Sequence, residues 1–159
     1  MLHLTLTGLD DTERLGRALA GIMRASSCRV LLMYGDIGSG KTTLVRSLVA
    51  NLPGGLAAEV SSPSFTLCNH YPTRPPVVHC DLYRGCGGVP DELIDALDDE
   101  RSLVLVEWAE QLPQTDRPHD FLDIHWQTCK TTRLVTLSAT GPAATDALAR
   151  LPATWDGAS

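Results

Sequence analysis

Lysine, net positive charge and long apolar runs are scarce in this chain of 159 residues, and each shortage excludes a class of protein. Lys41 and Lys130 are its two lysines, and 13 lysines and arginines face 19 aspartates and glutamates, for a net charge of −6. A chain with that balance does not hold nucleic acid or an anionic membrane by its overall field. No apolar run approaches the roughly 20 residues of a membrane-spanning helix. With 43% hydrophobic and 20% charged residues, the composition predicts an ordinary folded domain.

Cysteine and histidine spacing gives no sign of a disulfide framework or a zinc site. The cysteines are odd in number and include no Cys-x-x-Cys pair, and the histidines lack metal-ligand spacing. We therefore expect buried free thiols in a reducing cytosol: Cys28, Cys68, Cys80, Cys86 and Cys129. Residues 1–11 lack the basic stretch of a secretory signal and include Asp10 and Asp11, so we expect a cytoplasmic protein.

Apolar periodicity predicts alternating strands and helices. Period-two alternation or short buried runs predict strands at 2–6, 30–34, 77–82, 102–107, 121–126 and 134–139. Helical spacing predicts helices at 12–26, with Asp11 as N-cap, and at 42–52, 90–98 and 143–151. The hydroxyl-rich residues 60–67 predict a loop that leads into an extended segment. Strands buried on both faces need helical cover, which indicates an α/β fold.

One segment matches the phosphate-binding pattern G-x-x-x-x-G-K-[ST] without a mismatch: Gly35-Asp36-Ile37-Gly38-Ser39-Gly40-Lys41-Thr42. Its glycines let consecutive backbone N–H groups face phosphate oxygens at the positive end of the following helix. Lys41 would neutralise the β- and γ-phosphates, and Thr42 would ligate Mg²⁺. The alternative is a solvated helix start. It is disfavoured because a lysine there would face the positive end of the helix dipole.

Two acids end buried apolar runs and are candidates for the chemistry. Asp81 and Glu107 each follow such a run, and ligands of open α/β sheets bind at the carboxyl ends of strands. One acid would ligate the metal and the other would position the nucleophile, and the residues alone leave the assignment open. Residues 61–66 fit either a switch that senses the γ-phosphate or an ordinary turn. Trp108, next to Glu107, fits either the core or a ligand stack.

The sequence favours an adenine nucleotide over a guanine nucleotide. A small GTPase reads its base with an Asn-Lys-x-Asp motif, and neither of the two asparagines, Asn51 and Asn69, precedes a lysine.

Four blocks in one order resemble the TsaE (YjeE) family, the bacterial ATPase of tRNA threonylcarbamoyladenosine biosynthesis. They are residues 35–44, Ser62-Pro63-Ser64-Phe65-Thr66-Leu67, His79-Cys80-Asp81-Leu82-Tyr83-Arg84 and Val106-Glu107-Trp108-Ala109-Glu110. The resemblance covers about residues 12–139. It implies a single α/β P-loop NTPase domain over 1–159, with a mixed, mostly parallel central sheet flanked by helices and a C-terminal helix and tail at 142–159.

The resemblance also implies a function. It implies a Mg²⁺-dependent ATPase that works with the partner proteins TsaB and TsaD. We expect its hydrolysis to be weak alone and stimulated by these partners, because the sequence fixes no obvious arginine finger. Those partners make the N6-threonylcarbamoyl modification on adenosine 37 of tRNAs that read ANN codons. The tRNA would be held by the partners, in keeping with the acidic charge of this chain.

Roles for individual residues follow from the same resemblance. Catalytic roles fall to Lys41, Asp81 and Glu107, and metal binding to Thr42, Asp81 and Glu107, with Glu107 the better match to the metal ligand. Nucleotide binding falls to Thr12, Gly38, Ser39, Gly40, Lys41, Thr42, Thr43, Ser64, Trp108 and Arg133. Within that set, Thr12, ahead of the first helix, and Arg133, opening a late strand, match positions at the nucleoside end.

The sequence departs from the family pattern at two points. Ser64 stands where threonine is commoner and keeps the hydroxyl, and Ala109 replaces a usual proline. Arg84 is a candidate arginine finger. Two other functions remain open: a small-molecule kinase that uses the same phosphate loop, and a nucleotide-dependent interaction module that does not hydrolyse ATP.

Overall fold

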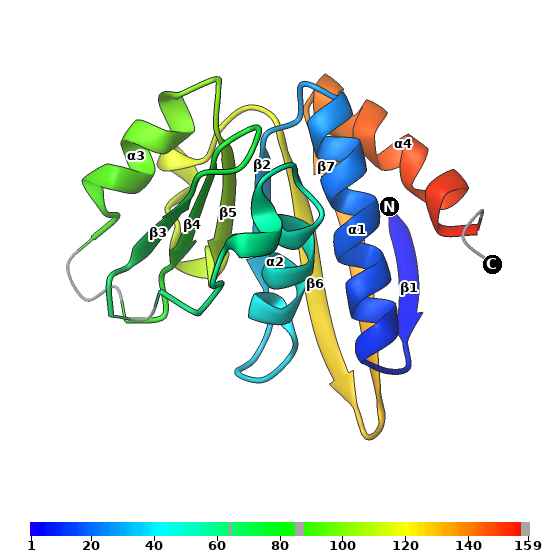
Figure 1. Cartoon of the computed structure of the whole chain (residues 1–159). Helices are drawn as coiled ribbons and strands as arrows, with labels where there is room; N and C mark the ends of the chain where they lie inside the picture. The colour runs from blue at the N-terminus through cyan, green and yellow to red at the C-terminus, as the bar shows by residue number, and fades with distance from the viewer. Residues whose placement is uncertain (64, 85–87, 157–159) are drawn as a thin grey trace.

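A central sheet of seven strands organises the computed structural model, which describes residues 1–63, 65–84 and 88–156 (Figure 1). The strands are β1 (Leu2–Leu6), β2 (Val30–Tyr34), β3 (Cys68–Tyr71), β4 (Val77–Asp81), β5 (Leu103–Glu107), β6 (Phe121–Cys129) and β7 (Thr132–Thr140). The α-helices are α1 (Leu9–Ala25), α2 (Lys41–Ala50), α3 (Asp91–Asp98) and α4 (Pro142–Asp156). The helices and strands predicted from apolar periodicity are present, and their ends shift by a few residues.

The sheet has a parallel centre and antiparallel edges. Its order is β1-β7-β6-β2-β5-β4-β3. Strands β6, β2, β5 and β4 run parallel to their neighbours in that set, whereas β1, β7 and β3 pair antiparallel. The predicted mixed α/β sheet with helices on its faces is therefore confirmed. The parallel strands bring the carboxyl ends of β2, β4 and β5 to the same edge of the sheet.

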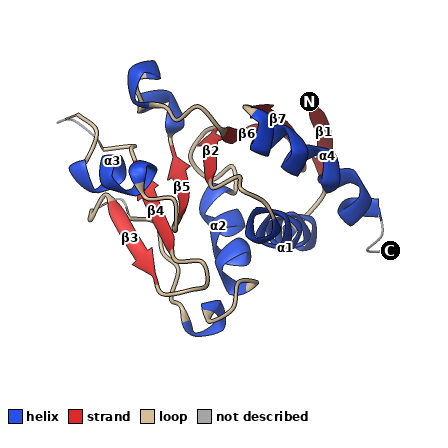
Figure 2. Ribbon diagram, turned by 90° about the horizontal axis from the view of Figure 1, so that it is seen from above, coloured by secondary structure: helices blue, strands red, loops and turns tan. Residues whose placement is uncertain are grey.

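Side chains of the central strands pack into two apolar layers, one with α1, α2 and α4 and the other with α3. The ribbon view has α2 and α3 on opposite sides of the sheet (Figure 2). Along β5, Leu103 and Leu105 pack in the layer of α1, α2 and α4, and Val104 and Val106 pack in the layer of α3. This alternation is what a strand buried on both faces requires. It also fixes the face on which Glu107, two residues after Leu105, presents its side chain.

The first helix begins earlier than predicted, and Asp11 is not its N-cap. Helix α1 starts at Leu9 with Gly8 at the N-cap position, and Gly8 has no side chain to cap with. Asp11, inside the first turn, reaches back and accepts hydrogen bonds from the backbone N–H and the hydroxyl of Thr7, each at 2.7 Å. A carboxylate in the first turn also favours the positive end of the helix dipole. Thr12 consequently lies inside the helix rather than ahead of it.

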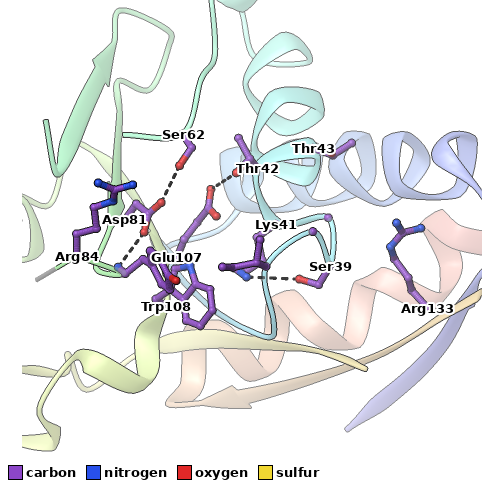
Figure 3. A pocket seen from close by; sticks show the side chains of 14 residues that line it. Ser39, Lys41, Thr42, Thr43, Ser62, Asp81, Arg84, Glu107, Trp108 and Arg133 are labelled. Carbon is purple, nitrogen blue, oxygen red and sulfur yellow. Dashed lines mark hydrogen bonds between the residues drawn. The ribbon is translucent and has the colours of Figure 1, made fainter. Parts of the chain in front are cut away.

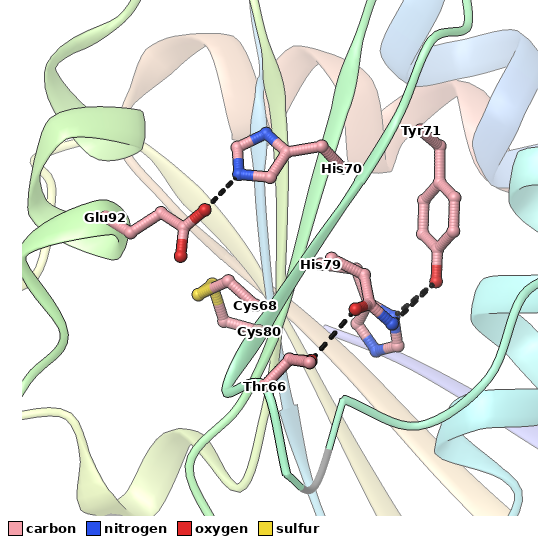
Figure 4. Close-up of a disulfide and its surroundings, with 8 residues drawn as sticks. Thr66, Cys68, His70, Tyr71, His79, Cys80 and Glu92 are labelled. Carbon is pink, nitrogen blue, oxygen red and sulfur yellow. Dashed lines mark hydrogen bonds and ion pairs between the residues drawn. A yellow bond between two sulfur atoms is a disulfide. The ribbon is translucent and has the colours of Figure 1, made fainter.

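Cys68 and Cys80 form a disulfide, so the prediction that both are free thiols is wrong (Figure 4). They stand opposite each other in the antiparallel β3–β4 pair, with their Cα atoms 4.1 Å apart. Cysteines directly opposite across two antiparallel strands lie close enough to bridge. Cysteine count and spacing do not reveal that register, because it depends on how the intervening turn brings the strands together.

The other cysteines lie apart from this bridge. Cys28 is a buried free thiol, as predicted, and burial raises its pKa to about 11. Cys129 is a free thiol of intermediate exposure. Cys86 falls outside the described residues. Among the described residues, no helix combines the length and the hydropathy needed to cross a membrane.

Helices α1 and α2 approach closely at Gly16. A Cβ atom at this position would lie 2.6 Å from both Cβ and Oγ of Ser47 and 2.9 Å from the backbone N of Leu48. The Ser47 hydroxyl donates to the Glu13 carbonyl oxygen at 2.7 Å. The missing side chain at Gly16 therefore lets α1 support α2, the helix that follows the phosphate loop.

We expect Gly16→Ala to destabilise the fold and Gly21→Ala, on the exposed side of the same helix, to stabilise it. The first substitution forces apart two packed helices and should cost about 1–3 kcal/mol of unfolding free energy. The second meets no atom within 4 Å and should gain up to about 1 kcal/mol, because alanine is the better helix former. Urea denaturation of both variants checks the pair. Equal effects of the two substitutions would contradict the close contact.

Candidate functional site

The phosphate-loop motif forms the turn between β2 and α2. Gly35, Gly38 and Gly40 have φ angles of 140°, 76° and 116°, a region that side chains with a Cβ rarely adopt. Helix α2 starts immediately afterwards at Lys41, and the Leu44 N–H donates to the Gly40 carbonyl oxygen at 2.9 Å. The glycines therefore allow the backbone to turn into the helix N-terminus, where unpaired N–H groups favour an anion.

Lys41 lies at the centre of this loop with its ammonium group buried. The side chain donates to the carbonyl oxygens of Gly35 at 2.5 Å and Asp36 at 2.9 Å, and its Nζ lies 4.3 Å from the centre of the Trp108 ring. Burial lowers the pKa of Lys41, and the Glu107 carboxylate opposes that shift. A cation desolvated to this degree attracts a phosphate group strongly.

Thr42 and Glu107 place two oxygen ligands next to the loop (Figure 3). The Thr42 hydroxyl donates to Oε1 of Glu107 at 2.8 Å, and Glu107, the last residue of β5, is 3% exposed. Mg²⁺ is commonly held through one or two protein oxygens together with phosphates and water. Within the described ranges no three His, Cys, Asp or Glu side chains form a metal cluster. A hydroxyl and a carboxylate are oxygen donors of the kind that Mg²⁺ takes together with phosphates.

Asp81 ends β4 beside Glu107 and is held by two donors. Its register partner in the parallel β4–β5 pair is Glu107. The Ser62 hydroxyl donates to Oδ2 at 2.7 Å, and the Tyr83 N–H donates to Oδ1 at 2.9 Å. Asp81 is 3% exposed. Both predicted acids thus face the phosphate loop from neighbouring strand ends.

Ser62 is a site residue that the sequence analysis did not single out, although it lies in the hydroxyl-rich segment at 61–66. That composition is the signal that could have found it. Ser64, the predicted nucleotide contact of the same segment, lies outside the described residues.

A cavity of about 370 Å³ joins these groups, and its size is in the usual range for a small-molecule site. Among the predicted residues it is lined by Gly38, Ser39, Gly40, Lys41, Thr42, Thr43, Asp81, Glu107, Trp108 and Arg133. Thr12 is not among the lining residues, because it is buried in α1 with its hydroxyl 3.4 Å from the Gly8 carbonyl oxygen.

Two buried donors lie beside the last glycine of the loop. Nε1 of Trp126 and Nε of Arg133 have no hydrogen-bond partner within the described part of the chain. Each lies 3.8 Å from the position that a Cβ on Gly40 would take. Buried donors are normally paired, and of these two residues Arg133 lines the cavity, where a ligand could supply an acceptor. Trp126 had been interpreted only as a strand residue, because alternation alone does not distinguish a core indole from a donor at a site.

Aromatic side chains form the outer wall of the cavity. The Trp108 ring lies 4.7 Å from the Tyr83 ring, so Trp108 faces the site rather than the core alone. The Arg84 guanidinium lies 4.8 Å from the centre of the exposed Phe65 ring. Arg84 therefore reaches the rim of the cavity and packs on an aromatic face there.

Comparisons with known proteins find relatives in sequence and in fold. Residues 6–135 match the family model described as threonylcarbamoyl adenosine biosynthesis protein TsaE. The TsaE protein of Streptomyces coelicolor is 40% identical over 62% of this chain and 67% of its own length, and that of Aquifex aeolicus is 35% identical over 76% and 83%. The crystal structure of Bacillus subtilis YdiB superposes with a TM-score of 0.75 at 25% identity, covering 96% of this chain and 94% of that chain.

We expect Lys41→Met to weaken the binding of inorganic triphosphate in the presence of Mg²⁺. Loss of a charge-assisted hydrogen bond costs about 1.5–3 kcal/mol, which corresponds to a roughly 10- to 150-fold higher dissociation constant. Calorimetry measures the change. The matched control is Lys130→Met, since Lys130 is the other lysine and lies exposed on the β6–β7 turn. Equal affinities of the two variants would rule out the loop as the anion site.

Proposed function

This chain belongs to the TsaE family and has its role in tRNA threonylcarbamoyladenosine biosynthesis, and from that premise we propose that it binds and hydrolyses ATP with Mg²⁺. The observation that carries the proposal is the meeting of Lys41, Thr42 and Glu107 around one cavity at the end of the phosphate loop. A phosphate loop, a hydroxyl ligand and a strand-end carboxylate are the parts that P-loop phosphoryl transfer uses.

The residues divide the work of hydrolysis as follows. The loop N–H groups and Lys41 bind the β- and γ-phosphates, and the two unpartnered donors on Trp126 and Arg133 lie beside Gly40, the last glycine of the loop. Thr42 and Glu107 would hold Mg²⁺, which would supply charge neutralisation to the phosphates. Of the two acids, we assign the metal to Glu107 rather than to Asp81, because Glu107 accepts the Thr42 hydroxyl.

Asp81 then orients the attacking water. Its carboxylate is fixed by Ser62 and by the Tyr83 N–H, so its position is set before the nucleotide arrives. The water oxygen bonds to the γ-phosphorus while the bond to the bridging oxygen of ADP breaks, and the products are ADP and inorganic phosphate. Pre-set geometry of this kind lowers the cost of reaching the transition state.

Partner proteins complete the function. Arg84 packs on Phe65 at the rim rather than at the loop, so hydrolysis by this chain alone is slow and a partner accelerates it by reshaping that rim. We propose TsaB and TsaD as the partners and the cytoplasm as the compartment. With a net charge of −6, the chain meets tRNA only through them.

We expect Glu107→Gln to lower kcat for ATP hydrolysis by at least about 100-fold, because it removes a charged group that acts on the transition state. Release of inorganic phosphate from γ-labelled ATP measures it, with Glu110→Gln as a control, since Glu110 is an exposed acid three residues later. Wild-type turnover of ATP by Glu107→Gln would contradict the role of Glu107 in hydrolysis. Label transferred to a small-molecule acceptor instead of water would indicate a kinase.

A mixture of the TsaB and TsaD proteins should raise the ATP turnover of this chain, because Arg84, the candidate arginine finger, packs on Phe65 and a partner can reposition it. The measurement compares turnover with and without the pair, and with the pair alone as control. The same rate in both conditions would refute stimulation. If Glu107→Gln supported full tRNA modification with the pair, the chain would act as a nucleotide-dependent module without hydrolysis.

A further inference from the structure

His79 is a fully buried polar residue in an otherwise apolar part of the sheet. It is 0% exposed and lies on β4, two residues before Asp81. Strand alternation places it on the face of the sheet that packs against α2, the same face as Val77 and Leu105. A buried imidazole costs free energy unless its nitrogens are hydrogen-bonded. The hydrogen-bond partners of His79 therefore indicate its role.

Both ring nitrogens of His79 have partners, and one of them is the proposed metal ligand. Nε2 lies 2.9 Å from Oε1 of Glu107, the same oxygen that accepts the Thr42 hydroxyl at 2.8 Å. Nδ1 lies 3.3 Å from the hydroxyl of Tyr71, a residue of β3 that is 6% exposed (Figure 4). The four side chains form a continuous chain of contacts from the edge strand to the phosphate-loop helix.

The direction of these hydrogen bonds follows from the chemistry of the groups. An ionised carboxylate has acceptors only, so Nε2 of His79 carries the proton that Glu107 receives. With that proton on Nε2, Nδ1 is an acceptor for the Tyr71 hydroxyl, which lies 3.3 Å from Nδ1 and 3.5 Å from the Ser61 carbonyl oxygen. Burial raises the pKa of Tyr71. The shorter contact to Nδ1 favours the tautomer of His79 that can donate to Glu107.

We propose that His79 is a positioning residue for Glu107 and that Tyr71 positions His79 in turn. His79 holds Oε1 of Glu107 against Thr42, so that the metal ligands on α2 and β5 are aligned before the nucleotide binds. This assignment rests on the proposed function, because the orientation of Glu107 matters for metal binding only if Glu107 is a metal ligand. Partners behind a metal ligand typically contribute 10- to 100-fold to metal affinity when they fix the ligand's orientation.

The test measures metal binding rather than turnover. Electron paramagnetic resonance of Mn²⁺, with the full chain and a non-hydrolysable ATP analogue, gives the metal dissociation constant. We expect His79→Leu, which removes the donor, to raise that constant by roughly 10- to 100-fold. His79→Gln, whose amide N–H can replace Nε2, should restore it to within a few-fold. Binding of ADP in EDTA should be unchanged in both variants, because it needs the loop and no metal.

A matched control lies on the same hairpin. His70, on β3, is exposed and faces α3, where it contacts Glu92, so His70→Leu should leave Mn²⁺ affinity unchanged. If His79→Leu does not fold, Tyr71→Phe tests the same chain of contacts. It removes one hydroxyl and should weaken Mn²⁺ binding by about 2- to 10-fold.

The outcomes distinguish failure of the role of His79 from failure of the proposed function. Wild-type Mn²⁺ affinity in His79→Leu, or equal losses in His79→Leu and His79→Gln, overturns the role of His79 while ATP binding stands. If His79→Leu does not fold and Tyr71→Phe does, unchanged Mn²⁺ affinity in Tyr71→Phe also overturns the role of His79. If the wild-type chain binds neither ADP nor the ATP analogue, the proposed function falls, and the role of His79 falls with it.

Discussion

The hydrogen bond between Thr42 and Glu107 is the contact on which the site depends, because it joins the first turn of α2 to the carboxyl end of β5. These residues are 65 positions apart in the chain. The parallel pairing of β2 with β5 brings the loop after β2 beside the end of β5, and the glycine turn sets the start of the helix. At Gly16, the close packing of α1 on α2 then holds that helix against the sheet. The fold is thus arranged to align two oxygen atoms.

Much of this arrangement could be predicted from local sequence. The phosphate loop can be recognised in the sequence because each of its residue types has a separate role at a fixed spacing. Asp81 and Glu107 can be recognised because each ends a run of buried residues. Parallel strands direct their carboxyl ends to one edge of a sheet, so the meeting of loop and acids followed from strand assignment. These inferences need only periodicity and chain direction.

Two features that were not predicted, the disulfide and the His79–Glu107 contact, depend on register between strands. Cys68 meets Cys80, and His79 meets Glu107, only because β3, β4 and β5 pair with particular offsets. A shift of one residue would turn each of these side chains to the opposite face. Asp11 was assigned as an N-cap on residue type alone, although a carboxylate can stabilise the helix start from inside the first turn as well. Residue type limits which contacts a side chain can make, and the pairing of the strands determines which of them it makes.

The charges of the site bear on how an acidic protein would bind an acidic ligand, as we propose, and on why a metal would take part. Lys41 shares the cavity with the carboxyl groups of Asp81 and Glu107, and its lowered pKa reflects burial that these carboxylates only partly offset. With both acids ionised, the three groups sum to a negative charge, which disfavours a bare triphosphate. A divalent cation held at Glu107, as we propose, would reverse that balance locally. Under this proposal metal and nucleotide binding would be coupled through Glu107, and a group that fixes its carboxylate would act on both.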